Sequence, residues 1–144
     1  MRLVIISAAA AVAIAGCAGA IAAPAPNPAL PPAPAKGAGL PAGQCFRSHD
    51  IRNHTIADRQ TLLLSVKGNE VYRVVVAGGC LAGAVSSDPI VTRNPPGSEI
   101  VCKPIDLDIA IGRHGASFPA QCIVESIDKL SPEQVAALPR KVKP

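Results

Sequence analysis

The sequence predicts a small, mainly β domain of antiparallel strands with a short helix at its carboxyl end. Several short segments alternate apolar and polar residues with period two, turn residues separate them, and no stretch has the apolar period of a long helix. Four cysteines follow the amino-terminal leader, and their even number predicts two disulfides. We expect five or six strands forming a partly closed β-barrel or a sandwich, stapled by two disulfides. The barrel is preferred because the strands are few and short.

The clearest strand pair lies within residues 61–80. One face of each strand is apolar, with Leu62, Leu64 and Val66 followed by Tyr72, Val74 and Val76. Residues 67–70 supply the turn. A loop of two residues would place Leu64 opposite Arg73, whereas a loop with one more residue places Leu64 opposite Val74 and leaves Arg73 on the solvent-facing side. We expect the odd loop, because it keeps the apolar side chains on one face.

The other elements follow from similar patterns. We expect strands at residues 51–56, 90–92, 106–111 and 121–127, the last two forming a pair. Ser131 predicts the cap of a short helix, because Pro132 suits its first position and Gln134 completes a capping box. The helix should end near Leu138, before Pro139.

The amino terminus predicts a secretory signal peptide over residues 1–22. Met1-Arg2 is a short positive region, and Leu3 to Ala15 is an apolar run shorter than the ~20 residues that span a bilayer. Residues 14–17, Ile-Ala-Gly-Cys, resemble a bacterial lipobox, in which the cysteine receives lipid. We therefore favour lipidation at Cys17. The alternative is ordinary cleavage after the small-x-small pattern of residues 20–22.

Composition divides the rest of the chain into three parts. Residues 23–43 form a linker rich in proline and alanine, which predicts an extended spacer. Residues 44–139 form the β domain, and residues 140–144 form a basic tail that we expect to be solvated. Between Cys45 and Leu138 there are nine Lys/Arg and ten Asp/Glu, so the domain is almost neutral. This balance argues against nucleic acid as a partner.

The four cysteines after the leader predict disulfides, because an exported chain folds in an oxidising compartment. Their shortest spacing is 19 intervening residues, which disfavours a zinc site and excludes a thioredoxin-type redox pair. Sequence allows three connectivities. We prefer Cys80 with Cys102, which would close an irregular segment, and Cys45 with Cys122, which would tie the start of the domain to its last strand.

No motif of catalysis or cofactor binding occurs in the sequence. His49 and His54 should point to opposite faces of a strand, and His114 lies between glycines, so we expect three surface histidines. Asp106 and Asp108 could do acid–base work or bind calcium, but their alternation favours the solvated face of a strand. The prediction is therefore no catalytic residue, no metal and no cofactor.

Several short motifs resemble a family of small exported bacterial proteins of unknown function, whose members often carry a lipobox leader. The similar motifs are Cys45-Phe46, Ile51-Arg52-Asn53, Gly78-Gly79-Cys80, Val101-Cys102, Gln121-Cys122-Ile123 and Leu130-Ser131-Pro132-Glu133. The resemblance covers Cys45 to Leu138 and departs at His54, where the family commonly has an aromatic residue. It implies an exported four-cysteine domain and carries no activity.

Together these observations predict a non-enzymatic envelope protein, either a lipoprotein held to the membrane through Cys17 or a soluble periplasmic or secreted binding module. Its partner would be another envelope component. The alternative is an inhibitor of an extracellular or periplasmic hydrolase, a role suited to small stapled β domains. An enzyme is the least favoured class, because motifs are absent and titratable residues are sparse.

Overall fold

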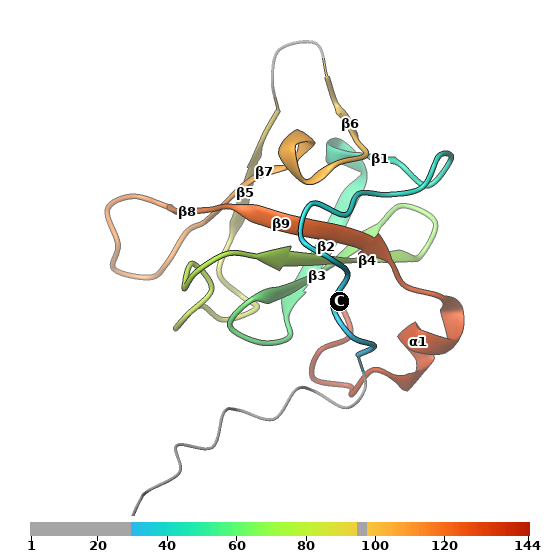
Figure 1. Cartoon of the computed structure of the whole chain (residues 1–144). Coiled ribbons are helices and arrows are strands. Elements are labelled where there is room, and N and C mark those ends of the chain that lie inside the picture. Colours follow the sequence, from blue (N-terminus) through green and yellow to red (C-terminus); the bar gives the residue numbers. More distant parts are fainter. Residues whose placement is uncertain (1–29, 95–97) are drawn as a thin grey trace, which may run out of the picture.

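The structure is a computed structural model that describes residues 30–94 and 98–144 (Figure 1). The predicted leader, residues 1–22 with Cys17, lies outside the described residues. The strands are β1 (Phe46–Arg47), β2 (Ile51–Ile56), β3 (Thr61–Val66), β4 (Glu70–Val76), β5 (Ile90–Arg93), β6 (Ile100–Val101), β7 (Asp108–Ile111), β8 (Ala120–Cys122) and β9 (Val124–Lys129). The helices are η1 (Ser48–Asp50), η2 (Pro104–Asp106) and α1 (Pro132–Ala137). The mainly β class with one short α-helix is confirmed.

The described strands form three antiparallel sheets, ordered β2-β3-β4-β9, β5-β7-β8 and β1-β6. The sheets do not close into a barrel. They pack in a sandwich-like arrangement, so the sandwich is right and the preferred barrel is wrong. The predicted strand at 121–127 is in fact two strands, because the chain leaves one sheet at Cys122 and enters the other at Val124. Ile123, between them, accepts a hydrogen bond from the backbone of Ala77 at 2.8 Å.

The central hairpin has the expected odd loop but a different pairing. Leu64 lies opposite Tyr72, not opposite Val74. The turn uses the three residues 67–69, and Gly68 and Asn69 both adopt positive φ, at 90° and 62°. Glu70 therefore belongs to the strand rather than to the turn. A shift of two residues preserves the faces, which explains why parity was predicted correctly while the partners were not.

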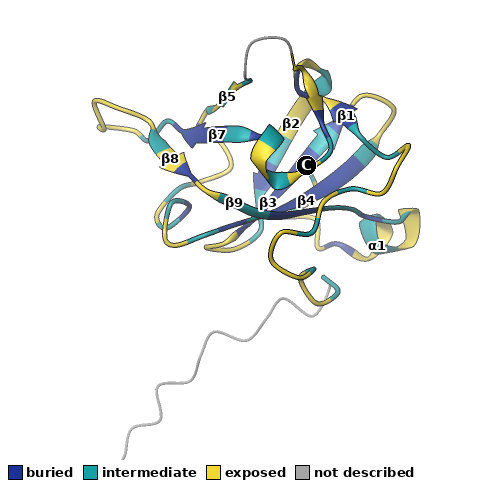
Figure 2. Cartoon of the chain, turned by 45° about the horizontal axis from the view of Figure 1, so that its top comes forward, coloured by how far each residue is buried: buried dark blue, intermediate teal, exposed yellow. Residues whose placement is uncertain are grey.

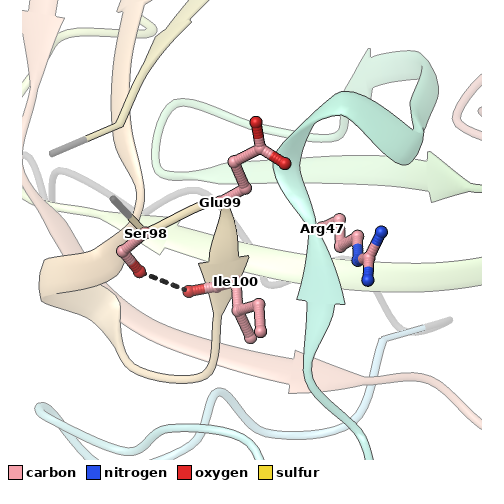
Figure 3. Close-up of a pocket in the computed structure, with 4 residues that line it drawn as sticks. All are labelled: Arg47, Ser98, Glu99 and Ile100. Atoms are coloured by element: carbon pink, nitrogen blue, oxygen red, sulfur yellow. Dashed lines mark hydrogen bonds between the residues drawn. The ribbon is translucent and has the colours of Figure 1, made fainter. Parts of the chain in front are cut away.

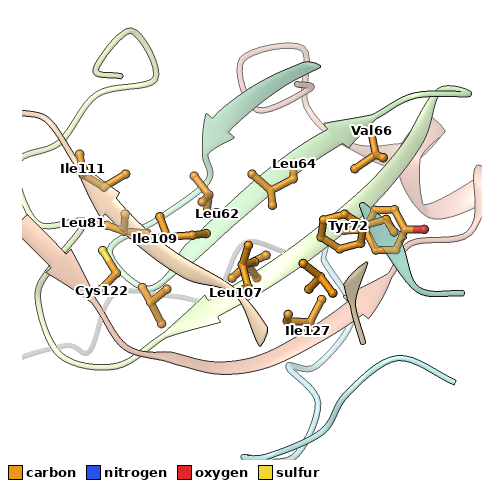
Figure 4. Packing of buried hydrophobic residues seen from close by; sticks show 14 residues of the cluster. Leu62, Leu64, Val66, Tyr72, Leu81, Leu107, Ile109, Ile111, Cys122 and Ile127 are labelled. Carbon is orange, nitrogen blue, oxygen red and sulfur yellow. The ribbon is translucent and has the colours of Figure 1, made fainter. Parts of the chain in front are cut away.

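A main core fills the space between the sheets (Figure 4). Its fully buried members come mostly from the inward faces of the strands and include Leu62, Leu64, Tyr72, Val74, Val76, Leu81, Val101, Ile109, Ile111 and Ile127. The ring of Phe46 lies 4.5 Å from that of Tyr72, measured between centroids. Thus the two aromatic rings of the core sit together where the small sheet meets the large one.

The opposite face of the large sheet, which we expected to be solvated, carries a second apolar cluster. We call it the outer cluster; its buried members are Leu63, Val71, Leu130 and Leu138, and Leu30, Ala57, Val135 and Val142 pack against them. Helix α1 supplies part of this cover. Its cap is confirmed: Ser131 Oγ accepts from Gln134 N, and Gln134 Oε1 accepts from Ser131 N at 2.7 Å. The large sheet is therefore buried on both faces in this region (Figure 2).

The described part of the proline-rich segment, residues 30–43, and the basic tail both pack on the domain. Gly37 N donates to Glu125 O at 2.7 Å, and Ile127 N donates to Ala38 O at 3.0 Å, so the segment lies along the open edge of β9. Leu40 reaches the main core. Gly37 and Ala38 of the expected linker thus pair with β9, and Leu40 N donates to Cys102 O at 2.7 Å. The tail is not fully solvated either, since Val142 packs into the outer cluster.

Candidate functional site

Both disulfides form, but with a connectivity different from the one we preferred. Cys45 is bonded to Cys102 and Cys80 to Cys122. Strands β1 and β6 explain the first pair: Phe46 lies opposite Val101, so their outer neighbours Cys45 and Cys102 meet, with Cα atoms 4.6 Å apart. The second pair joins the loop after β4 to the end of β8. The expected pairs Cys80–Cys102 and Cys45–Cys122 were wrong because the β1–β6 pairing was not recognised in the sequence.

The histidines and aspartates considered for catalysis do not come together in one site. His49 Nδ1 lies 3.2 Å from Glu99 Oε2, and His54 Nε2 lies 2.9 Å from Asp88 O. His114 is exposed in the turn after β7. Residues 30–94 and 98–144 contain no group of three or more His, Cys, Asp or Glu placed to hold a metal ion.

Asp106 and Asp108 do not share the predicted outer strand face. Asp106 lies in η2, where its carboxylate accepts from the backbone N–H groups of Cys102 and Lys103 at 3.1 and 2.8 Å. Asp108 begins β7 and accepts from the side-chain amide of Gln121 on β8. The two carboxylates therefore brace local structure: one caps a turn and the other supports a strand pair.

A shallow hollow of about 460 Å³ lies beside the small sheet, lined by Arg47, Ser98, Glu99 and Ile100 (Figure 3). The side chains of Arg47, Glu99 and Ile100 point in different directions, and Ser98 Oγ donates back to Ile100 O at 3.4 Å. A binding site usually gathers polar groups toward one point. The polar groups of this hollow do not converge on one point, so the hollow does not indicate a binding site.

A loop projects from the domain between β7 and β8 (Figures 1 and 2). We call residues 112–119 the Phe118 loop. Phe118 is 84% exposed, although the other two aromatic residues of the chain are buried. Ile123, directly after β8, is 71% exposed. Exposed aromatic and aliphatic side chains beside an edge strand are typical of contact surfaces.

The base of the Phe118 loop is held from three sides. The Cys80–Cys122 disulfide fixes the strand that follows the loop. Arg113, at its start, donates to the carbonyl of Cys80, and Gly112 N donates to Pro89 O at 2.8 Å. A Cβ at Gly112 would lie 3.0 Å from the Pro89 ring, so this close approach favours glycine. The loop is therefore a projection on a braced base. The sequence signal of this loop is an aromatic residue among Gly, Ser and Pro.

A polar group formed by Glu70, Tyr72 and Lys129 joins β4 to β9, the edge strand of the large sheet. Tyr72 Oη donates to Glu70 Oε2 at 2.9 Å, and Lys129 Nζ contacts Glu70 Oε1. Burial raises the pKa of Tyr72 above its usual range, and the hydrogen bond to Glu70 raises it further. The hydrogen bonds from Lys129 and Tyr72 lower the pKa of Glu70. This group stabilises the pairing of β4 with β9, and none of its members lines the hollow beside the small sheet.

These features define a small β domain stapled by two disulfides, with one braced, exposed loop. The chain belongs to DUF6491, a family of unknown function whose model matches residues 1–143. Searches of the curated proteins and of the solved structures gave no match. Over the part of the chain that the structure describes, no helix is both long and apolar enough to cross a bilayer.

Proposed function

We propose that this protein is a bacterial envelope lipoprotein that is exported, anchored through Cys17, and acts by binding rather than by catalysis. The observation that carries the proposal is the pair of disulfides, Cys45–Cys102 and Cys80–Cys122, in a chain whose leader resembles a lipobox. Structural disulfides persist in oxidising compartments such as the periplasm. Export through a signal peptide would take the domain there.

A binding role is supported by how the polar side chains are used. His54, Asp106 and Asp108 each have a local structural partner, so they are occupied in holding loops and strands. The large exposed apolar side chains include Phe118 and Ile123, which flank β8, and Ile105, which is as exposed as Phe118. This combination favours contact with a macromolecule over chemistry on a small substrate.

The second candidate function, inhibition of a hydrolase, is favoured by the same loop. An inhibitor works best when its contact loop is already ordered, because little conformational entropy is then lost on binding. The Cys80–Cys122 disulfide and the Arg113 hydrogen bond to Cys80 hold the loop base in this way. Phe118 would be the side chain that enters the enzyme.

Fatty-acid labelling tests the anchor. The native protein should incorporate a labelled fatty acid and fractionate with membranes, and Cys17→Ala should lose the label. The matched control is Cys17 retained with Ala20→Leu, which disturbs only the alternative cleavage pattern and should keep the label. An unlabelled native protein in the soluble fraction would overturn the lipoprotein proposal.

Site-specific photo-crosslinking tests the binding surface. A photoreactive residue at Phe118 should capture a discrete partner in cells, while one at Lys67, in the hairpin turn, should not. Capture of a single hydrolase would favour the inhibitor, and capture of a structural envelope component would favour the binding module. Equal yields at both positions, or none at Phe118, would reject the Phe118 loop as the contact surface.

A further inference from the structure

The point where the described chain begins and the basic tail lie side by side, although they are more than 100 residues apart in sequence (Figure 1). Leu30 and Val142 pack into the same outer cluster. Thr55 Oγ1 donates to Lys143 O at 3.3 Å, which holds the tail against β2. The described chain therefore begins, at Leu30, on the face that carries the tail.

The packing of the tail determines where its charges point. Val142 is half-buried, and its N–H donates to Pro139 O at 3.0 Å, which closes a turn. Arg140, Lys141 and Lys143 around it are exposed. Lys143 Nζ also donates to Ala136 O at 3.1 Å, which keeps its charge beside the end of α1. The turn thus holds three exposed cations beside the outer cluster, into which both Val142 and Leu30 pack.

We propose that these three cations dock on the anionic headgroups of the membrane that holds the anchor. The inference rests on the proposed lipidation at Cys17. Thirteen residue steps separate Cys17 from Leu30, and a fully extended chain of that length spans at most about 45 Å. The anchor therefore keeps the domain close to the bilayer and attaches it on the face that carries the cations.

The tether between anchor and domain determines whether this weak electrostatic contact is populated. A basic residue near an anionic surface strengthens binding by about fivefold, so three of them give roughly a hundredfold. That is too little to hold a free protein on a membrane. A short tether, however, raises the effective concentration to the millimolar range, where a weak contact is populated. The basic tail therefore orients the anchored domain and does not anchor it.

Residue-specific lysine acetylation of the lipidated full chain tests this orientation. The protein is reconstituted into vesicles of neutral phosphatidylcholine, and into vesicles that contain phosphatidylglycerol and phosphatidylcholine in equal parts. Lys141 and Lys143 should react at least about threefold more slowly on the anionic vesicles, and added salt should remove the difference. Lys67, in the exposed hairpin turn between β3 and β4, is the internal control and should react equally on both.

Charge reversal gives the matched comparison. Arg140→Glu with Lys141→Glu should abolish the protection of Lys143, whereas Arg47→Glu with Lys67→Glu, at exposed positions elsewhere, should leave it intact. Equal acetylation of Lys141 on both vesicle types, with the protein incorporated, would overturn the docking inference alone. A chain that carries no lipid and does not incorporate would overturn the anchor and the inference together. Protection that requires added envelope protein would assign the tail to an acidic protein partner instead.

Discussion

Arg73 and Asp128 lie opposite each other on β4 and β9 and form an ion pair on the outer face of the large sheet, with Nε 2.8 Å from Oδ1. Arg73 is 4% exposed. Its remaining nitrogens donate to the carbonyls of Pro31 and Pro32, the latter at 3.1 Å. One guanidinium therefore joins two strands to the proline-rich segment, and its burial is compensated by a carboxylate and two carbonyls.

Replacing Arg73 by glutamine should release the proline-rich segment. Removing one partner of a buried ion pair is expensive, and because Asp128 keeps some solvent contact we expect a loss of about 2–4 kcal/mol in unfolding free energy. Trypsin should then cut after Lys36 at least several-fold faster, because Gly37 and Ala38 would leave β9. The matched control, Arg93→Gln at an exposed position, should change neither quantity. An unchanged cleavage rate in Arg73→Gln would show that Arg73 does not hold the segment.

Leu63 and Leu64 should both be costly to truncate, because they belong to cores on opposite faces of β3. Each is fully buried. Leu63→Ala and Leu64→Ala should each cost about 2–5 kcal/mol in denaturant unfolding with disulfides intact. Lys67→Ala, in the exposed turn, should stay within about 0.5 kcal/mol. A small loss of unfolding free energy in Leu63→Ala would mean that the outer cluster does not exist as described.

Peptide mapping under non-reducing conditions should recover Cys45 joined to Cys102 and Cys80 joined to Cys122. Replacing Cys80 and Cys122 together by alanine should lower the unfolding free energy by about 2–4 kcal/mol. The same double variant should also increase protease cutting after Arg113, because the Phe118 loop loses one of its supports. Recovery of a Cys45–Cys122 peptide would contradict the pairing.

Tyr72 makes the protein sensitive to alkali. Its pKa is raised in the folded state, so above pH ~10 the unfolded chain loses a proton that the folded protein retains, and stability falls as pH rises. Tyr72 is the one tyrosine of the chain, and there is no tryptophan, so the ultraviolet absorbance of tyrosinate reports this residue alone. The absorbance should rise only with unfolding. Titration near pH 10 while the fold is intact would contradict the burial of its hydroxyl.

Glu70 gives the opposite pH dependence at the acid end. Its pKa is lowered when folded, so the stabilisation is present above the unfolded pKa of about 4.3 and is lost as pH falls through the folded value. Glu70→Gln should be less stable at neutral pH and should lose less stability on acidification. Glu133→Gln, on the exposed helix end, is the comparison for a carboxyl outside the sheet. Equal acid profiles for native protein and Glu70→Gln would remove Glu70 from the pH response.

The local sequence pattern correctly predicted those elements that depend on interactions between nearby residues. The strand at 51–56, the odd hairpin loop and the capped helix after Ser131 all appear, because side-chain alternation, turn chemistry and capping act over a few residues. The exact pairing of Leu64 depended on whether Glu70 joins the turn. Glu70 contacts Tyr72 and also Lys129, which lies 59 residues further along the chain. These contacts place Glu70 in the strand. No window of sequence around the turn contains that information.

Long-range contacts account for the errors. Strands β1 and β6 are two residues each and leave no periodic signal, yet their pairing sets the Cys45–Cys102 disulfide. Proline-rich composition predicted an extended spacer, because proline-rich chain favours polyproline II. The segment nevertheless docks, since the carbonyls of Pro31 and Pro32 still accept hydrogen bonds and Gly37 supplies a donor.

The pairing of Gly37 and Ala38 with β9 also imposes an order on folding. A polypeptide is made from its amino terminus, so Gly37 and Ala38 are synthesised before their partners Glu125 and Ile127, which follow 88 and 89 residues later. During that interval the proline-rich segment must stay unpaired without joining another strand. Frequent prolines make it a poor template for aggregation, because they interrupt the row of backbone donors. The same proline-rich composition that predicts an unpaired linker therefore suits a segment that must stay unpaired until β9 has been made.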